Sequence, residues 1–148
     1  EKEQVGWDWF SLQLQDGRDL MVFQIRRADG DMDPHSSGTV VERDGQVTHL
    51  RLGDFALVPE QTWHSAASGG SYPTAWTITV PSHNLHLHVA AAFPGQELQT
   101  TASTGVTYWE GSLVVSSVEG STQDVAGHGY LEMTGYAGKS MGTVFGVE

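Results

Sequence analysis

The sequence has no cysteine and few basic residues. The absence of cysteine excludes disulfide bonds, thiolate metal sites and cysteine nucleophiles, but it leaves the cellular compartment open. Seven Lys and Arg stand against eighteen Asp and Glu, which gives a formal net charge of −11 with histidine neutral. A nucleic-acid-binding protein, or one held on an anionic membrane by charge, needs clustered positive side chains. The charge balance therefore disfavours both classes.

Long apolar runs and helical periodicity are also missing. No uninterrupted apolar stretch approaches the roughly 20 residues that would span a bilayer, and no charged-then-apolar signal peptide opens the chain. No amphipathic helix of ten or more residues can be recognised. The chain has five Trp, four Tyr and five Phe, which can build a core of large side chains, so disorder throughout is not expected.

The periodicity that is present is two, which is typical of β-strands. The length of 148 residues favours one domain with one core. Eighteen glycines indicate many tight turns between short strands. About eight or nine strands at regular spacing predict an all-β antiparallel barrel or sandwich. We expect the strands at residues 7–14, 19–26, 39–43, 46–52, 55–58, 75–80, 85–91, 106–118 and 124–136.

The first two strands are expected to form a hairpin around Asp16-Gly17. If these two residues are the whole loop, Leu14 lies opposite Asp19. Trp7 and Trp9 then lie on the mixed face of the hairpin. The apolar face ends at Asp8 and contains Phe10, Leu12, Leu14, Met21, Phe23 and Ile25.

Asp8 is the first candidate for chemistry. It stands between Trp7 and Trp9, and an apolar surrounding disfavours a charged carboxylate and raises its pKa, as a general acid requires. Alternatively, Asp8 is a strand-end residue that is solvated or accepts backbone hydrogen bonds.

A second carboxylate, Glu110, follows the aromatic residues Tyr108 and Trp109 and shares a strand face with Tyr108. Tyr130 and Glu132 share a face of the following strand. Two acids in an aromatic-lined cavity, with Trp109 as a further wall, could protonate an alkene or ether and stabilise a developing cation. The alternative is a set of ordinary barrel residues that hydrogen-bond to one another.

His86 and His88 are two residues apart on an expected strand and therefore share a face. Two imidazoles on one face can contribute to a metal site, and the segment before His64 partly resembles the second cupin motif. However, no Glu follows His88 at the distance that the first cupin motif requires. The alternative is the outward polar side of a half-buried strand. We therefore predict no metal site and no cofactor.

Short motifs in a definite order run through nearly the whole chain, from Gly6 to about Gly146. They include Gly6-Trp7-Asp8-Trp9-Phe10, Asp16-Gly17-Arg18, Ser37-Gly38-Thr39, Gln96-Glu97-Leu98, Tyr108-Trp109-Glu110-Gly111 and Gly129-Tyr130-Leu131-Glu132-Met133. Together these motifs resemble the C-terminal half of AttH-like proteins. That group shares a superfamily with the acyclic carotenoid hydratases, or hydroxyneurosporene synthases, and is often labelled as predicted secreted hydrolases.

The resemblance implies one lipocalin-like (calycin) antiparallel barrel over residues 1–148 and an exported, periplasmic or secreted location. Relatives usually carry two such barrels, so an association with an N-terminal barrel domain or with a second copy is a further expectation. The relatives share an apolar cavity.

Three functions stay open at this point. The first is binding of an apolar or amphipathic small molecule without chemistry. The second is an acid-catalysed hydratase, lyase or hydrolase with Asp8 and Glu110 as the catalytic pair. In both cases the residues expected to line the ligand site are Trp7, Trp9, Tyr108, Trp109, Tyr130 and Glu132. The third is a cupin-like metal-binding barrel at His86 and His88.

Overall fold

The computed structural model describes residues 4–100 and 102–137. Almost all regular structure in this part is strand, and one short 3₁₀ helix, η1 (Pro81–His83), adds to it. No helix in the described ranges is long and apolar enough to cross a membrane. The all-β prediction is confirmed. The strands are β1 (Gln4–Leu14), β2 (Asp19–Arg27), β3 (Ser37–Val41), β4 (Val47–Arg51), β5 (Ala56–His64), β6 (Ser71–Val80), β7 (Leu85–Ala91), β8 (Glu97–Gln99), β9 (Thr107–Ser117) and β10 (Gly127–Thr134).

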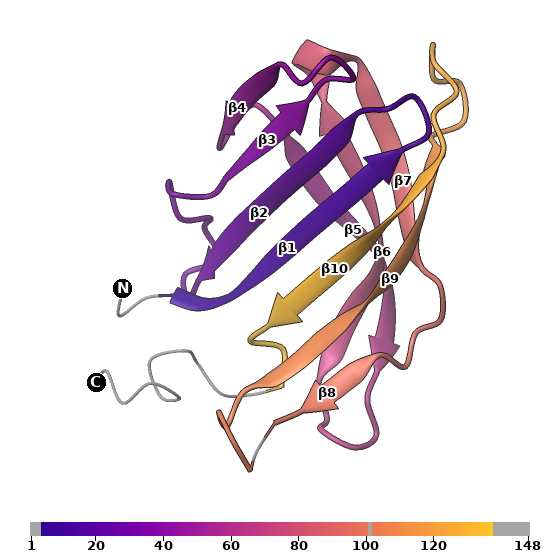
Figure 1. Cartoon of the computed structure of the whole chain (residues 1–148). Helices are drawn as coiled ribbons and strands as arrows, with labels where there is room; N and C mark the ends of the chain where they lie inside the picture. Colours follow the sequence, from indigo (N-terminus) through magenta and orange to yellow (C-terminus); the bar gives the residue numbers. More distant parts are fainter. Residues whose placement is uncertain (1–3, 101, 138–148) are drawn as a thin grey trace.

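The strands form one antiparallel sheet in the order β4-β3-β2-β1-β10-β9-β7-β6-β5, and β8 pairs with β9 beside this path. The pairing of β1 with β10 brings the first and the last described strand together in the middle of the sheet. The sheet curls on itself, so that β1, β2 and β10 form one wall and β5, β6 and β7 lie behind them (Figure 1). This arrangement is a curled half-barrel of the lipocalin-like kind.

Large side chains fill the inside of the curl. Phe10 on β1 meets Trp76 on β6 edge to face, with ring centroids 5.2 Å apart, so the two walls pack directly against each other. The rings of Trp76, Trp109, Tyr72 and Phe10 are all at most 1% exposed. Burial of such side chains contributes about 1.5–3 kcal/mol each, so this interior is the main source of stability.

The register of the first hairpin differs from the prediction by one residue. Gln13, and not Leu14, lies opposite Asp19. The loop has three residues, because Leu14 accepts a hydrogen bond from the Gly17 amide and donates one to the Arg18 carbonyl. Gly17 has a φ of +94°, the conformation that a three-residue hairpin loop requires. The shift moves Met21, Phe23 and Ile25 to the outer face and brings Leu20 and Val22 inside.

Candidate functional site

The end of β1 carries alternating residues with opposite surroundings. Asp8 points into the curled sheet and is completely buried, whereas Trp7 and Trp9 lie half-buried on the outer face. This separation follows from the two-residue period of a strand. Two candidate sites therefore lie back to back on one strand.

The outer face of this region is hollowed into a cleft of about 390 Å³. Most of its wall is apolar and comes from β1 and β2, and an acidic side chain from β10 stands at one side. The residues that line it are Gln4, Trp7, Trp9, Phe23, Ile25 and Glu132.

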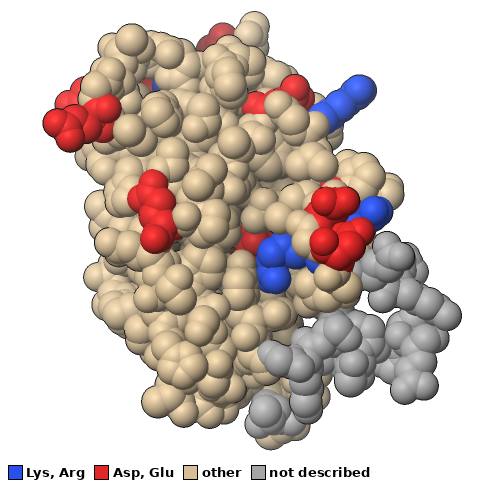
Figure 2. Space-filling view, turned by 180° about the vertical axis from the view of Figure 1, so that it is seen from behind, with Lys and Arg blue, Asp and Glu red and all other residues tan. Residues whose placement is uncertain are grey.

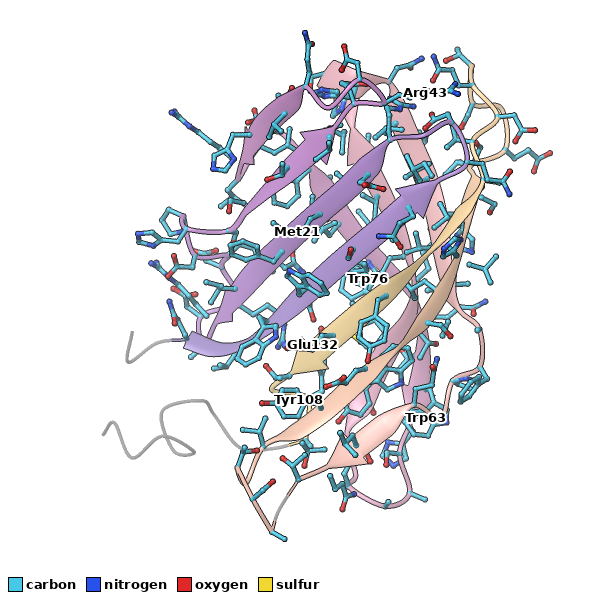
Figure 3. All side chains as sticks on the ribbon, in the orientation of Figure 1. Met21, Arg43, Trp63, Trp76, Tyr108 and Glu132 are labelled. Atoms are coloured by element: carbon cyan, nitrogen blue, oxygen red, sulfur yellow. The ribbon has the colours of Figure 1, made fainter. Side chains whose placement is uncertain are left out.

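Trp7 holds the acidic side of the cleft in place. Its indole Nε1 donates a 2.8 Å hydrogen bond to Glu132 Oε1. The same ring lies against Tyr108 of β9, with centroids 6.3 Å apart and planes at 60°. Figure 3 shows Glu132 and Tyr108 in the same region of β10 and β9, on the outer side of the wall in front of Trp76. The aromatic surface thus extends over three neighbouring strands.

Glu132 lies directly opposite Glu110 in the pairing of β10 with β9. Both side chains are on the outer face and half-buried. Tyr130 donates a 2.7 Å hydrogen bond from its hydroxyl to Glu110 Oε2. This hydrogen bond raises the pKa of Tyr130 to about 12, and desolvation and the charges of both glutamates act in the same direction. The outer face therefore carries two neighbouring carboxylates beside aromatic rings.

The inner site is built around Asp8. Tyr136 donates a 2.8 Å hydrogen bond to Oδ1, while Gln24 Nε2 at 2.8 Å and Arg26 Nε at 3.1 Å donate to Oδ2. Burial raises the pKa of Asp8, and it outweighs the opposing attraction of Arg26 and the hydrogen bonds. Both carboxyl oxygens of Asp8 are occupied by side chains of the protein itself.

Arg26 ties this inner site to the end of β10. Its guanidinium lies 4.0 Å from the centre of the Tyr136 ring and donates to the Thr134 carbonyl. Gly6 stands against the same groups, and a Cβ at that position would overlap both the Thr134 carbonyl and the Arg26 guanidinium. The glycine that precedes Trp7-Asp8 is thus required for close approach of the backbone.

The structure separates several residues that the sequence interpretation grouped together. Asp8 faces inward and Glu110 outward, so the two carboxylates lie on opposite faces of the sheet and do not share a cavity. Trp109 also faces inward, where it is completely buried and donates from Nε1 to the Pro94 carbonyl at 2.7 Å. Trp109 is a core residue, because its neighbours Tyr108 and Glu110 take the outward positions of the strand.

The other site residues are brought together on the outer face. Trp7, Trp9 and Glu132 line the cleft, and Tyr108 packs against Trp7. Tyr130 is 40% exposed at the side of the same face. The expected common face of Tyr130 and Glu132 is confirmed, because the residues that alternate with them, Leu131 and Met133, are buried on the opposite face.

Three residues of the cleft were missed by sequence reasoning. A two-residue hairpin loop predicts Phe23 and Ile25 on the opposite face, but the loop has three residues, which turns both side chains toward the cleft. The Asp16-Gly17 sequence is compatible with a two-residue loop and with a three-residue loop, so the sequence alone does not distinguish these two lengths. Gln4 lies before the first expected strand, which the structure extends to the start of the described chain.

His86 and His88 lie on the outward side of β7, between the buried residues Leu85, Leu87 and Val89. His88 Nδ1 lies 3.0 Å from Glu60 Oε2. In the described part of the chain, no group of three or more His, Cys, Asp or Glu side chains could hold a metal ion. Among the described residues, the two histidines thus have no third His, Cys, Asp or Glu side chain placed to complete a metal site with them.

Charged residues on the far side of the molecule do not form a basic surface. Figure 2 shows acidic and basic side chains there in small separate groups, with uncharged residues between them.

Comparisons with known proteins agree on the fold. The AttH-like family model matches residues 1–136. A crystal structure of a protein from Nitrosomonas europaea described as an AttH is 32% identical, with a TM-score of 0.81 over 93% of this chain and 40% of that chain. Kievitone hydratase from Nectria haematococca is 18% identical, with a TM-score of 0.70 over 88% of this chain and 39% of that chain. No curated protein matches. The chain spans about two fifths of the length of these two structures.

Proposed function

This chain belongs to the AttH-like family, and we propose that it binds an apolar or amphipathic small molecule in the outer cleft formed by β1, β2 and β10. The observation that carries the proposal is the cleft itself. Its volume of about 390 Å³ lies within the range of roughly 300–1,000 Å³ that is usual for small-molecule sites.

The composition of the cleft supports an amphipathic ligand. Trp7, Trp9, Phe23 and Ile25 supply apolar surface, whereas Gln4 and Glu132 supply polar groups that can orient one end of a ligand. Aromatic side chains that remain half-exposed on a sheet face lose contact with water when a ligand covers them. Binding would therefore be driven mainly by the apolar part of the ligand.

The acid-catalysed alternative is less well supported by the geometry. A general acid must come within hydrogen-bond reach of the atom that it protonates. The Asp8 side chain is completely buried, and each of its oxygens already accepts from a protein side chain. Kievitone hydratase shares the fold at 18% identity, and its activity is not a basis for assigning chemistry to this chain.

The test compares two phenylalanine variants. Phe23→Ala removes a ring from the cleft wall, whereas Phe93→Ala removes one that is 57% exposed and outside the cleft. Binding of the neutral dye Nile red is measured by fluorescence titration. We expect saturable binding with one site, about tenfold weaker in Phe23→Ala and unchanged in Phe93→Ala, because an aromatic contact surface of this size contributes about 1–2 kcal/mol.

Thermal unfolding of both variants provides the control for folding. If Phe23→Ala keeps a cooperative transition and binds the dye as tightly as the unchanged protein, the cleft is not the binding site. If the unchanged protein does not bind the dye saturably, the proposal fails.

A further inference from the structure

We propose that the ligand of the outer cleft carries a positive charge, as a substituted ammonium group attached to an apolar chain or ring. This inference rests on the proposed function and adds the chemical class of the ligand. It is carried by two observations: Glu132 lines the aromatic cleft, and Glu110 lies directly opposite Glu132 on the neighbouring strand.

Two negatively charged side chains lie directly opposite each other on neighbouring strands. Glu110 and Glu132 are cross-strand partners on the outer face of β9 and β10. Side chains in directly opposite positions have Cβ atoms about 4.5–5.5 Å apart, and like charges there are destabilising. A cation placed between the two carboxylates removes this repulsion.

No basic side chain in the described residues pairs with these two carboxylates. Within residues 4–100 and 102–137, no Lys, Arg or His forms an ion pair with Glu110 or Glu132. Their hydrogen bonds come from neutral aromatic donors, from Trp7 to Glu132 Oε1 and from Tyr130 to Glu110 Oε2. The second oxygen of each carboxylate has no hydrogen-bond donor in this part of the chain, and it can accept from an ammonium group.

Aromatic side chains surround the carboxylate in the cleft. Trp7 and Trp9 line the same cleft as Glu132, and Tyr108 extends the surface next to Trp7. An organic cation is attracted to the faces of such rings, most strongly to tryptophan. The apolar substituents of an alkylammonium can at the same time cover Phe23 and Ile25. A strongly hydrated metal ion would leave these apolar walls without a partner, so the site fits an organic cation better.

The experiment uses three probes with the same eight-carbon chain, each below its micelle concentration. They are octyltrimethylammonium, octanol and octanoate, and binding is followed by quenching of tryptophan fluorescence in the full chain. We expect octyltrimethylammonium to bind about tenfold more tightly than octanol, and octanoate to bind more weakly than both.

Charge-removing variants then locate the effect. Glu132→Gln and Glu110→Gln each keep an oxygen that can accept from Trp7 or Tyr130. Each is expected to weaken binding of octyltrimethylammonium about threefold to tenfold and to change octanol binding by a clearly smaller factor, so that the preference for the cation decreases. Glu119→Gln removes the same charge from an exposed turn and should not change the preference for the cation, which excludes an effect of net charge alone.

The outcomes distinguish the two proposals. Equal binding of all three probes would overturn the inference of a cationic ligand and leave the cleft as an apolar site. Saturable binding of none of the probes, together with failure of Nile red to bind, would remove the proposed function as well. A cation preference that persists in the Glu110→Gln, Glu132→Gln double variant would also overturn the inference, because the charge would then be recognised elsewhere.

Discussion

The carboxylates on the two sides of β1 differ in burial and in their hydrogen-bond partners. On the inner side, Asp8 is fully buried, and three protein side chains donate hydrogen bonds to it. On the outer side, Glu132 and its cross-strand neighbour Glu110 remain half-exposed beside aromatic rings and have only neutral donors in the described chain. A buried charge must be compensated by the protein for the fold to form, whereas a half-exposed one can be left for a ligand.

The largest effect is expected where the inner carboxylate is removed. Asp8→Ala leaves the Arg26 charge, the Gln24 amide and the Tyr136 hydroxyl without their shared acceptor. Loss of one partner of a buried ion pair typically costs about 3–5 kcal/mol, so we expect a decrease of this order in the free energy of unfolding measured in urea.

The matched control for this variant is Asp16→Ala. Asp16 forms a 2.7 Å ion pair with Arg18 near the surface, with 36% of its side chain exposed. Solvent screening limits such a pair to about 1 kcal/mol or less. Equal losses in the two variants would show that burial does not distinguish the inner carboxylate, and the contrast between the two sides of β1 would not hold.

The pH dependence of stability provides a smaller and more specific test. Because the pKa of Asp8 is raised above its ordinary value of 3.8, the folded state takes up this proton at higher pH than the unfolded state does. Protonation of Asp8 therefore stabilises the fold as the pH falls from 7 toward 4, whereas Asp8→Asn has no such group. We expect the free energy of unfolding of the unchanged protein, minus that of Asp8→Asn, to increase over this range in urea titrations.

Other acids act in the reverse direction, and they cancel in this difference. Hydrogen bonds from His35 and Gln4 hold the pKa of Asp33 well below its usual range, so its contribution to stability is lost at low pH in both proteins. A difference that shrinks as the pH falls would mean that the pKa of Asp8 is lowered by Arg26 and not raised by burial.

The smallest effect is expected on the outer face, and its sign is reversed. Glu110→Gln removes one of two like charges in directly opposite positions, which should stabilise the ligand-free protein by about 0.2–1 kcal/mol. In thermal unfolding this corresponds to an increase in Tm of about 1–4 °C. Glu119→Gln serves as the reference for a change in net charge alone. A lower Tm for Glu110→Gln than for this reference would show that the Glu110 carboxylate stabilises the ligand-free protein, and that its repulsion with Glu132 is not the dominant effect.

Much of the fold could be predicted from the alternation of apolar and polar residues. Leu85 to Ala91 was predicted with its observed bounds. The common strand face of Tyr108 and Glu110, and that of Tyr130 and Glu132, were also predicted correctly, but the sequence interpretation placed these faces around a cavity and the structure places them on the outside. The three-residue strand β8 was missed, because it is too short to show alternation. The hairpin register was wrong, because a loop longer by one residue reverses the faces of every following side chain.

The candidate site shows most clearly which features follow from the sequence pattern and which depend on the tertiary structure. Alternation alone established that Asp8 faces away from Trp7 and Trp9, since neighbouring residues of a strand point to opposite sides. It could not decide which side is the interior, because both sides carry apolar residues. That decision comes from the curl of the sheet, which places Phe10 against Trp76, and from the pairing of β1 with β10, which brings Glu132 to Trp7 across 125 residues of chain. Such contacts depend on strand order and register, which are properties of the whole sheet and not of any local segment.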